Sequence, residues 1–161
     1  MVVPLSFSTE IPRVVVRGLK IEDRPAIERI LAESPEAAPW SADSLLEAAR
    51  SGMRVWAAEL SGETSGFLVG RHAAGEFEIL NLAVLRAHRR RGIASRLLDT
   101  ALRWARGAGT ERMLLEVRAS NEAAIRLYAR HGFTACGRRT QYYQSPPEDA
   151  LLFARTLDEE F

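Results

Sequence analysis

The sequence predicts one α/β domain, of the α+β kind, in which a single mixed sheet of about seven strands is flanked by about four helices. Two observations support this fold class. Short runs rich in Val, Ile and Leu have the length and composition of strands, and longer segments carry apolar residues at helical spacing. Their order along the chain, βααβββαβαββ, combines hairpins with helical crossovers. Such an order is typical of a mixed sheet with helices on both faces.

The first half of the chain is expected to hold four strands and two helices. In order, these are a strand at 13–17, a helix over about 21–33, a helix beginning after Ser41, and strands at 55–60, 66–71 and 76–84. Ser41 can cap the second helix, and Trp40 is the hydrophobic residue that often precedes such a cap. Glycine-containing turns separate the three strands, which indicates hairpins.

The second half is expected to complete the sheet. It holds a helix from 93 to about 107, a strand at 113–117, a short helix from about 121, and strands at 133–143 and 150–155. Asn121 can cap the short helix and Gly132 can end it. Residues 1–12 contain two prolines and have no clear period, so we expect a flexible extension before a domain spanning 13–161.

Composition narrows the classes of function. The 161 residues carry 22 basic and 21 acidic side chains, a formal charge of +1, which gives no overall preference for nucleic acid. No apolar run approaches the ~20 residues that span a bilayer, and the first residues lack the features of a signal peptide. We therefore expect a cytoplasmic protein, a monomer or weak homodimer, that contacts neither a membrane nor nucleic acid directly. The three histidines are scattered, so no metal site is predicted, and the single cysteine, Cys136, is expected in the core.

A basic turn between the strand at 76–84 and the following helix is the strongest local signal. It consists of Arg89, Arg90, Arg91, Gly92, Ile93, Ala94 and Ser95. The start of a helix exposes unpaired N–H groups and the positive end of the helix dipole, which together bind phosphate. Gly92 and Ala94 leave room for close approach, and arginine forks suit phosphate oxygens. The turn predicts a pyrophosphate cradle, although its local sequence equally fits a solvated basic loop.

Two side chains outside this turn are candidates for acid–base chemistry. In an alternating strand Glu116 shares a face with Leu114, and the partial desolvation expected there favours a general base. A salt bridge to Arg118 or to another arginine would account for Glu116 equally well. Tyr128 lies on the short helix, and its position alone favours a core aromatic.

Three segments occurring in order resemble the GCN5-related N-acetyltransferases, the GNAT superfamily. The acetyl-CoA motif of that family, Gln/Arg-x-x-Gly-x-Gly/Ala, is matched by Arg89, Gly92 and Ala94. The segments L-E-V-R-A-S-N at 115–121 and L-Y-x-x-x-G-F at 127–133 follow it. The resemblance covers about 13–157 and extends to the ribosomal-protein-alanine N-acetyltransferase (RimI-type) branch. It implies the GNAT fold, acetyl-CoA as cosubstrate and no metal.

The resemblance also implies roles for individual residues. Glu116 would be the general base. Tyr128 would be the general acid that protonates the departing thiolate, in place of the core role that its position alone favours. The implied cofactor contacts are Leu82, Ala83 and Val84 on the strand edge, the turn from Arg89 to Ser95, Asn121 and Tyr128. The implied substrate contacts are Trp40, Glu116, Tyr142 and Tyr143. Four carboxylates, Glu76, Glu78, Glu148 and Asp149, could attract a basic peptide.

The implied reaction is transfer of acetyl to a protein N-terminus, namely the N-terminal alanine of a small-subunit ribosomal protein. The amine would attack directly while both substrates are bound. Two alternatives remain open at this point. One is an acetyltransferase of broader peptide, lysine or small-amine specificity, and the other is a non-catalytic acetyl-CoA-binding module.

Overall fold

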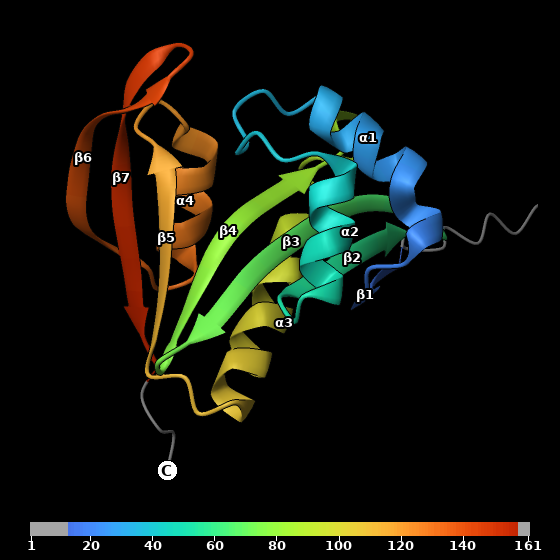
Figure 1. The fold of residues 1–161 in the computed structure, drawn as a ribbon, viewed down its shortest axis with the longest axis horizontal. Coiled ribbons are helices and arrows are strands. Elements are labelled where there is room, and N and C mark those ends of the chain that lie inside the picture. Colours follow the sequence, from blue (N-terminus) through green and yellow to red (C-terminus); the bar gives the residue numbers. More distant parts are fainter. Residues whose placement is uncertain (1–12, 158–161) are drawn as a thin grey trace, which may run out of the picture.

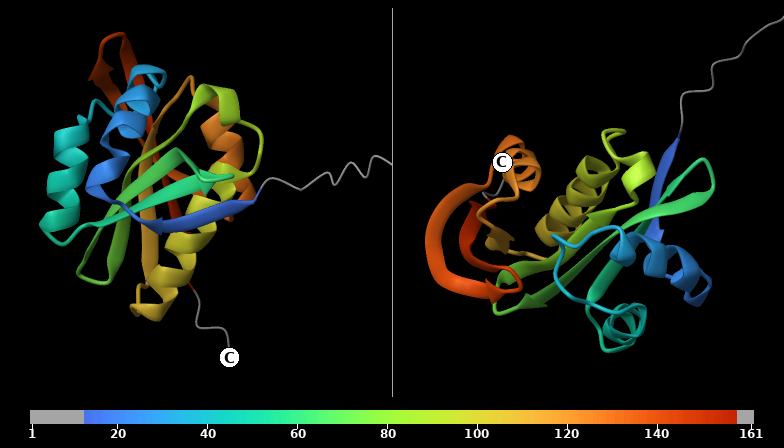
Figure 2. Two further views of the ribbon diagram at one scale, coloured as in Figure 1. Left: turned by 90° about the vertical axis from the view of Figure 1, so that its right-hand side faces the viewer. Right: turned by 90° about the horizontal axis from the view of Figure 1, so that it is seen from above.

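The computed structural model describes residues 13–157, which form one seven-stranded mixed sheet with helices on both faces (Figures 1 and 2). The elements are β1 (Val14–Gly18), η1 (Ile21–Asp23), α1 (Arg24–Ala32), α2 (Ala42–Arg50), β2 (Arg54–Leu60), β3 (Glu63–Ala73), β4 (Glu76–Val84), η2 (Arg86–His88), α3 (Ile93–Gly107), β5 (Arg112–Arg118), α4 (Glu122–Arg130), β6 (Thr134–Gln144) and β7 (Pro147–Thr156). The strand order is β1-β2-β3-β4-β5-β7-β6. The fold class predicted from the sequence is confirmed.

Two hydrophobic cores lie on opposite faces of the sheet. Alternation along β3 divides its side chains between them, with Phe67 in one core and Leu68 in the other. The first core lies beneath α1 and α2, whose fully buried residues include Ile30 and Leu45. The second core lies beneath α3 and α4, and the apolar stripe of α3 contributes Leu97 and other buried residues. The sheet is therefore fixed from both sides.

The two central strands separate halfway along their length. β4 and β5 are parallel and pair only from Glu76↔Arg112 to Ile79↔Leu115. In the pairing of β4 with β3, Val69 is opposite Asn81 and Gly70 is opposite Ile79, so Leu80 is an extra residue in a β-bulge. Such a bulge bends its strand. Beyond it the two strands diverge, as Figure 1 shows.

The helix ends follow the expected capping chemistry. The Ser41 side chain accepts a hydrogen bond from the Ser44 N–H at 3.0 Å, and the Asn121 side chain accepts one from the Ala124 N–H at 3.2 Å. The expected helix over 21–33 divides into η1 and α1, because the Asp23 carboxylate pairs with Arg17 and accepts the Lys20 N–H. The hydrophobic periodicity of the sequence does not reveal this division into two helices.

The expectation that Cys136 is a core residue is wrong. Cys136 is exposed, because it lies on the edge strand β6, in which almost every residue is exposed. Residues 1–12, expected to form an extension, lie outside the described residues. Within residues 13–157 no helix is both long and apolar enough to cross a membrane.

Candidate functional site

The turn between β4 and α3 has the backbone geometry of an anion cradle. Arg90 and Gly92 both have positive φ, of 63° and 78°, and α3 begins directly after Gly92. The first intrahelical bond runs from the Arg96 N–H to the Gly92 carbonyl at 3.0 Å, so the N–H groups of 93–95 have no partner within the helix. A Cβ on Gly92 would meet nothing within 4 Å, so the space above the turn is open. These features fit a diphosphate group.

Hydrogen bonds fix the approach to this cradle. His88 Nδ1 lies 2.6 Å from the hydroxyl of the buried Ser65, and the Leu85 N–H donates to the Ser65 carbonyl at 2.7 Å. The Arg89 side chain donates to the Val84 carbonyl at 3.1 Å and to Glu36 at 3.0 Å. Arg89 therefore ties the end of β4 to the segment after α1, whereas Arg90 and Arg91 form no ion pair within the described residues. The two later arginines are the better candidates for side-chain contact with phosphate.

The edge of β4 that leads to the cradle is unpaired on its β5 side. Leu82, Ala83 and Val84 pair with β3 but lie past the last pair with β5. Their free backbone groups can hydrogen-bond an extended chain. Next to them, the Asn81 side chain donates to the Ala38 carbonyl at 3.1 Å. That bond holds the connection that carries Trp40, which is half-buried against the α1/α2 core.

Glu116 is the first residue of β5 beyond its pairing with β4. Its side chain is 23% exposed and accepts a hydrogen bond from Arg139 Nε at 2.8 Å. The arginine comes from β6 and reaches across β7, since Glu116 is opposite Leu152 and Arg139 is opposite Ala150. Glu116 thus forms a salt bridge, as the sequence allowed, with Arg139 as the partner in place of Arg118. The salt bridge holds the Glu116 carboxylate at the point where β4 and β5 diverge.

Tyr142 and Tyr143 lie beside Glu116, and the buried Tyr128 lies near Tyr143. Its carboxylate raises the pKa of Tyr142 by accepting a hydrogen bond and by its charge, and burial followed by the same charge raises the pKa of Tyr143. Tyr128 is 7% exposed, packs edge-on against Phe133, and has its pKa raised far above the ordinary value by burial and by the neighbouring Tyr143. It therefore keeps its proton at neutral pH. The structure brings Glu116, Tyr128, Tyr142 and Tyr143 together, whereas Trp40 lies against a different core.

A wide bulge in β6 presents the exposed Tyr142 and the half-buried Tyr143. Arg139 is opposite Ala150 and Tyr143 is opposite Glu148, so residues 140–142 face the single residue Asp149. The Asp149 carboxylate accepts the Gln141 N–H at 2.8 Å and pairs with Arg138 at 2.5 Å. The backbone bond and then the ion pair lower the pKa of Asp149. Sequence reasoning missed this clamp, because strand spacing does not reveal the bulge that brings Gln141 to Asp149.

The carboxylates expected to attract a basic peptide are already engaged. Each pairs with an arginine of this chain, namely Glu76 with Arg112, Glu78 with Arg71, Glu148 with Arg118, and Asp149 with Arg138. Because these four carboxylates are paired within the chain, they leave little unpaired negative charge to attract a basic peptide. Among residues 13–157 no group of three His, Cys, Asp or Glu side chains is arranged for a metal ion.

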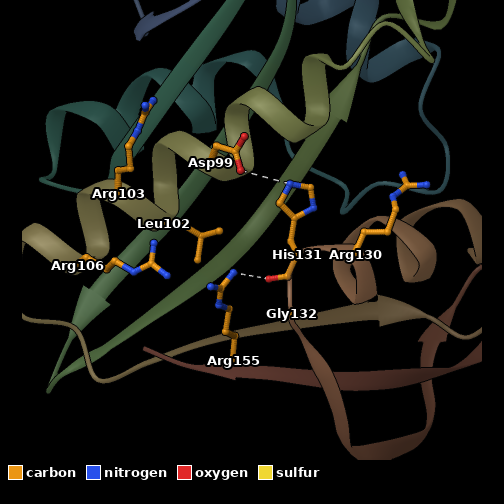
Figure 3. A pocket seen from close by; sticks show the side chains of 8 residues that line it. All are labelled: Asp99, Leu102, Arg103, Arg106, Arg130, His131, Gly132 and Arg155. Carbon is orange, nitrogen blue, oxygen red and sulfur yellow. Dashed lines mark hydrogen bonds and ion pairs between the residues drawn. The ribbon is translucent and has the colours of Figure 1, made fainter. Parts of the chain in front are cut away.

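Two hollows in the surface are lined by residues other than Glu116. One adjoins the cradle and is lined by residues of β1 together with Arg91, Gly92, Ser95 and Arg96. Another, of about 680 Å³, lies between α3, the end of α4 and β7 (Figure 3). Glu116 itself lies in the region where β4 and β5 separate.

Comparisons with known proteins agree with this geometry. Residues 21–133 match the Acetyltransferase (GNAT) family. The [ribosomal protein bS18]-alanine N-acetyltransferase of Escherichia coli is 32% identical over 143 residues, which are 86% of this chain and 95% of that protein. An uncharacterized protein of Mycobacterium leprae is 42% identical over 80 residues, half of this chain but only 21% of its own length.

Solved structures show the same fold. The ribosomal-protein-S18-alanine N-acetyltransferase from Escherichia coli superposes with a TM-score of 0.80 at 27% identity, covering 92% of this chain and 97% of that one. The protein yncA from Salmonella typhimurium, solved with its cofactor acetyl-CoA, superposes with a TM-score of 0.78 at 23% identity, covering 92% and 96%.

The fold and the matched sequences define an acyl-transferring enzyme that acts on amines. The chain belongs to the GNAT family of acetyltransferases, and its activity is acetyl-CoA-dependent N-acetylation.

Proposed function

We propose that this enzyme acetylates the N-terminal α-amine of a protein in the cytoplasm, namely the N-terminal alanine of a small-subunit ribosomal protein. The observation that carries the proposal is the position of Glu116, directly where β4 and β5 separate and beside Tyr142 and Tyr143. The similarity to a ribosomal-protein-alanine N-acetyltransferase over nearly its whole length supports the choice of acceptor.

The cofactor side of the site fits acetyl-CoA. The cradle amides of about 91–94 would bind the diphosphate, with Arg90 and Arg91 nearby. The unpaired edge at Leu82, Ala83 and Val84 would hydrogen-bond the pantetheine arm, and Asn121 and Tyr128 would flank it. When bound there, acetyl-CoA supplies an acetyl group activated as a thioester.

The chain's own side chains would move the protons. Glu116, directly or through water, takes a proton from the incoming α-ammonium so that the amine can attack. Tyr128 is protonated at neutral pH, as a tyrosine with its ordinary pKa of about 10 would also be, and it donates that proton to the departing sulfur. A backbone N–H near Leu82 stabilises the negative charge that develops on the thioester oxygen. Tyr142 and Tyr143, presented by the β6 bulge, border the peptide.

The experiment compares acceptors by measuring thiol release from acetyl-CoA. The substrates are a basic peptide beginning with alanine, the same peptide with a blocked N-terminus, and a small polyamine. We expect turnover with the free peptide alone. Equal turnover of the blocked peptide would show that the enzyme acts on side-chain amines, and faster turnover of the polyamine would place it among the small-amine acetyltransferases.

A further inference from the structure

Charge is distributed unevenly between the two faces of the sheet. On the α1/α2 side three exposed arginines are paired, with Arg24 bound to Asp43, Arg29 to Glu63 and Arg50 to Glu47. On the α3/α4 side several arginines form no ion pair with any carboxylate of residues 13–157. They are Arg90, Arg91, Arg96, Arg103, Arg106, Arg130 and Arg155. The net charge of +1 is thus an average over the chain, and the face beside α3 and α4 is strongly basic.

The lower part of this face is the hollow of Figure 3, which we call the arginine hollow. Arg103, Arg106, Arg130 and Arg155 line it from three elements, and the buried Leu102 forms its floor. Arg155 donates to the His131 carbonyl at 2.5 Å, and its side chain points toward that of Arg106 (Figure 3). The negative charge in its lining is Asp99, whose carboxylate lies 3.4 Å from His131 Nε2. Like charges facing one another across a hollow favour an anion between them.

The arrangement suits a polyanion better than a single ion. Arg96, Arg103 and Arg106 share one face of α3 and extend over ~15 Å at the usual rise of a helix. Arginine forks match phosphate oxygens. None of the eight residues lining the hollow is Phe, Tyr or Trp, so the hollow offers no surface for stacking bases. Backbone contacts of this kind recognise a phosphodiester chain without reading its sequence.

We propose that the arginine hollow binds the phosphate backbone of structured RNA. The choice of RNA rests on the proposed function, since an acceptor that assembles into the ribosome would bring RNA near the enzyme. The hollow is separate from the cradle, because Arg103 and Arg106 lie three to four helical turns beyond Gly92. The proposal departs from the expectation of no direct nucleic-acid contact, which rested on the balanced charge and on the absence of aromatic residues among the arginines that precede α3.

Fluorescence anisotropy with a labelled RNA hairpin of about 20 base pairs tests the proposal. Arg103→Glu/Arg106→Glu is compared with Arg29→Glu/Arg50→Glu, which makes the same change in charge on the opposite face. We expect micromolar binding at about 50 mM salt, with a log–log salt slope near −4 for about four phosphate contacts. The hollow variant should bind at least tenfold more weakly with a slope reduced by about 2, while the control variant stays within twofold of the unmodified protein. Circular dichroism checks that both variants are folded.

Two further measurements distinguish RNA in the hollow from an anion in the cradle and from unspecific attraction of negative charge. Saturating CoA should leave RNA binding intact, whereas displacement of the RNA would place the anion in the cradle and overturn the proposal. A glutamate-rich peptide of equal charge should bind at least tenfold more weakly than the hairpin, and equal binding would overturn the choice of RNA. Equal loss in both arginine variants would show dependence on net charge alone, which also refutes it. Because acetyl transfer is not measured, failure here leaves the proposed function untouched. Failure of the acceptor assay would remove the reason for choosing RNA but would not change the anisotropy result, so the two failures are distinguishable.

Discussion

Replacing Gly70 by alanine tests how the tight contact beside the β4 bulge supports the separation of β4 and β5. A Cβ at this position would overlap the Phe77 ring at Cζ and would lie 3.1 Å from the Glu78 carbonyl oxygen. Phe77 is fully buried and packs against Trp56 and Trp104, with ring centroids 6.2 and 5.5 Å away. The ring therefore has little room to move aside. Overpacking of this kind costs about 1–3 kcal/mol.

The expected result is a lower melting temperature. For a domain of this size each kcal/mol shifts the midpoint by about 2–4 °C, so a cost near 2 kcal/mol corresponds to about 4–8 °C. Gly107→Ala is the matched control, since a Cβ there meets nothing within 4 Å and alanine favours the end of α3. It should melt at the same temperature as the unmodified protein or slightly higher.

A double-mutant cycle tests whether the cost of Gly70→Ala arises from contact with the Phe77 ring. Phe77→Leu removes the atoms that the new Cβ would strike, so Gly70→Ala should cost less in that background. Circular dichroism melts of the four proteins give the coupling. If Gly70→Ala melts with the unmodified protein, or costs as much beside Leu as beside Phe, the packing account of the bulge is refuted.

Four further predictions concern the site and its supports. Glu116→Gln should lower turnover at least tenfold near neutral pH, and an unchanged rate would remove its role as general base. Tyr128→Phe should impair turnover while calorimetry shows that acetyl-CoA binding is largely kept, and an unchanged rate would remove its role as general acid. Asp149→Ala removes the carboxylate that holds the β6 bulge, so the KM for the acceptor peptide should rise by a larger factor than the KM for acetyl-CoA. An equal change in both KM values would contradict the role of Asp149 in holding the bulge. Burial opposes ionisation of Asp23, but hydrogen bonds from Arg17, Lys20 and Thr64 lower the pKa of its carboxyl on balance. The stability that the ionised Asp23 adds is therefore present at neutral pH and is lost as the pH falls below about 4. In urea titrations Asp23→Asn should therefore be less stable than the unmodified protein at pH 7 and approach it near pH 3, while a constant difference would refute the assignment.

Local patterns in the sequence were sufficient for the individual elements. The apolar stripe of α3, the caps at Ser41 and Asn121, and the glycine before α3 each act through neighbours within a few residues. The cradle could be predicted for the same reason, because a turn and the helix after it are contiguous. The order of elements then limits the topology to a mixed sheet. These features require no knowledge of which strands lie side by side.

Long-range pairing decided what those patterns left open. Glu116 has Arg139 as its partner because β7 inserts between β5 and β6, an arrangement that no local spacing encodes. Cys136 is exposed because β6 became an edge strand. Net charge is an average over the whole chain, whereas the fold pairs Arg24 and Arg50 beside α1 and α2 and leaves several arginines beside α3 and α4 without an ion pair within the described residues. The sequence by itself determined the elements and the phosphate-binding turn, because those depend on neighbouring residues. Only the tertiary structure decided which charges meet, because strand order and packing bring distant residues together.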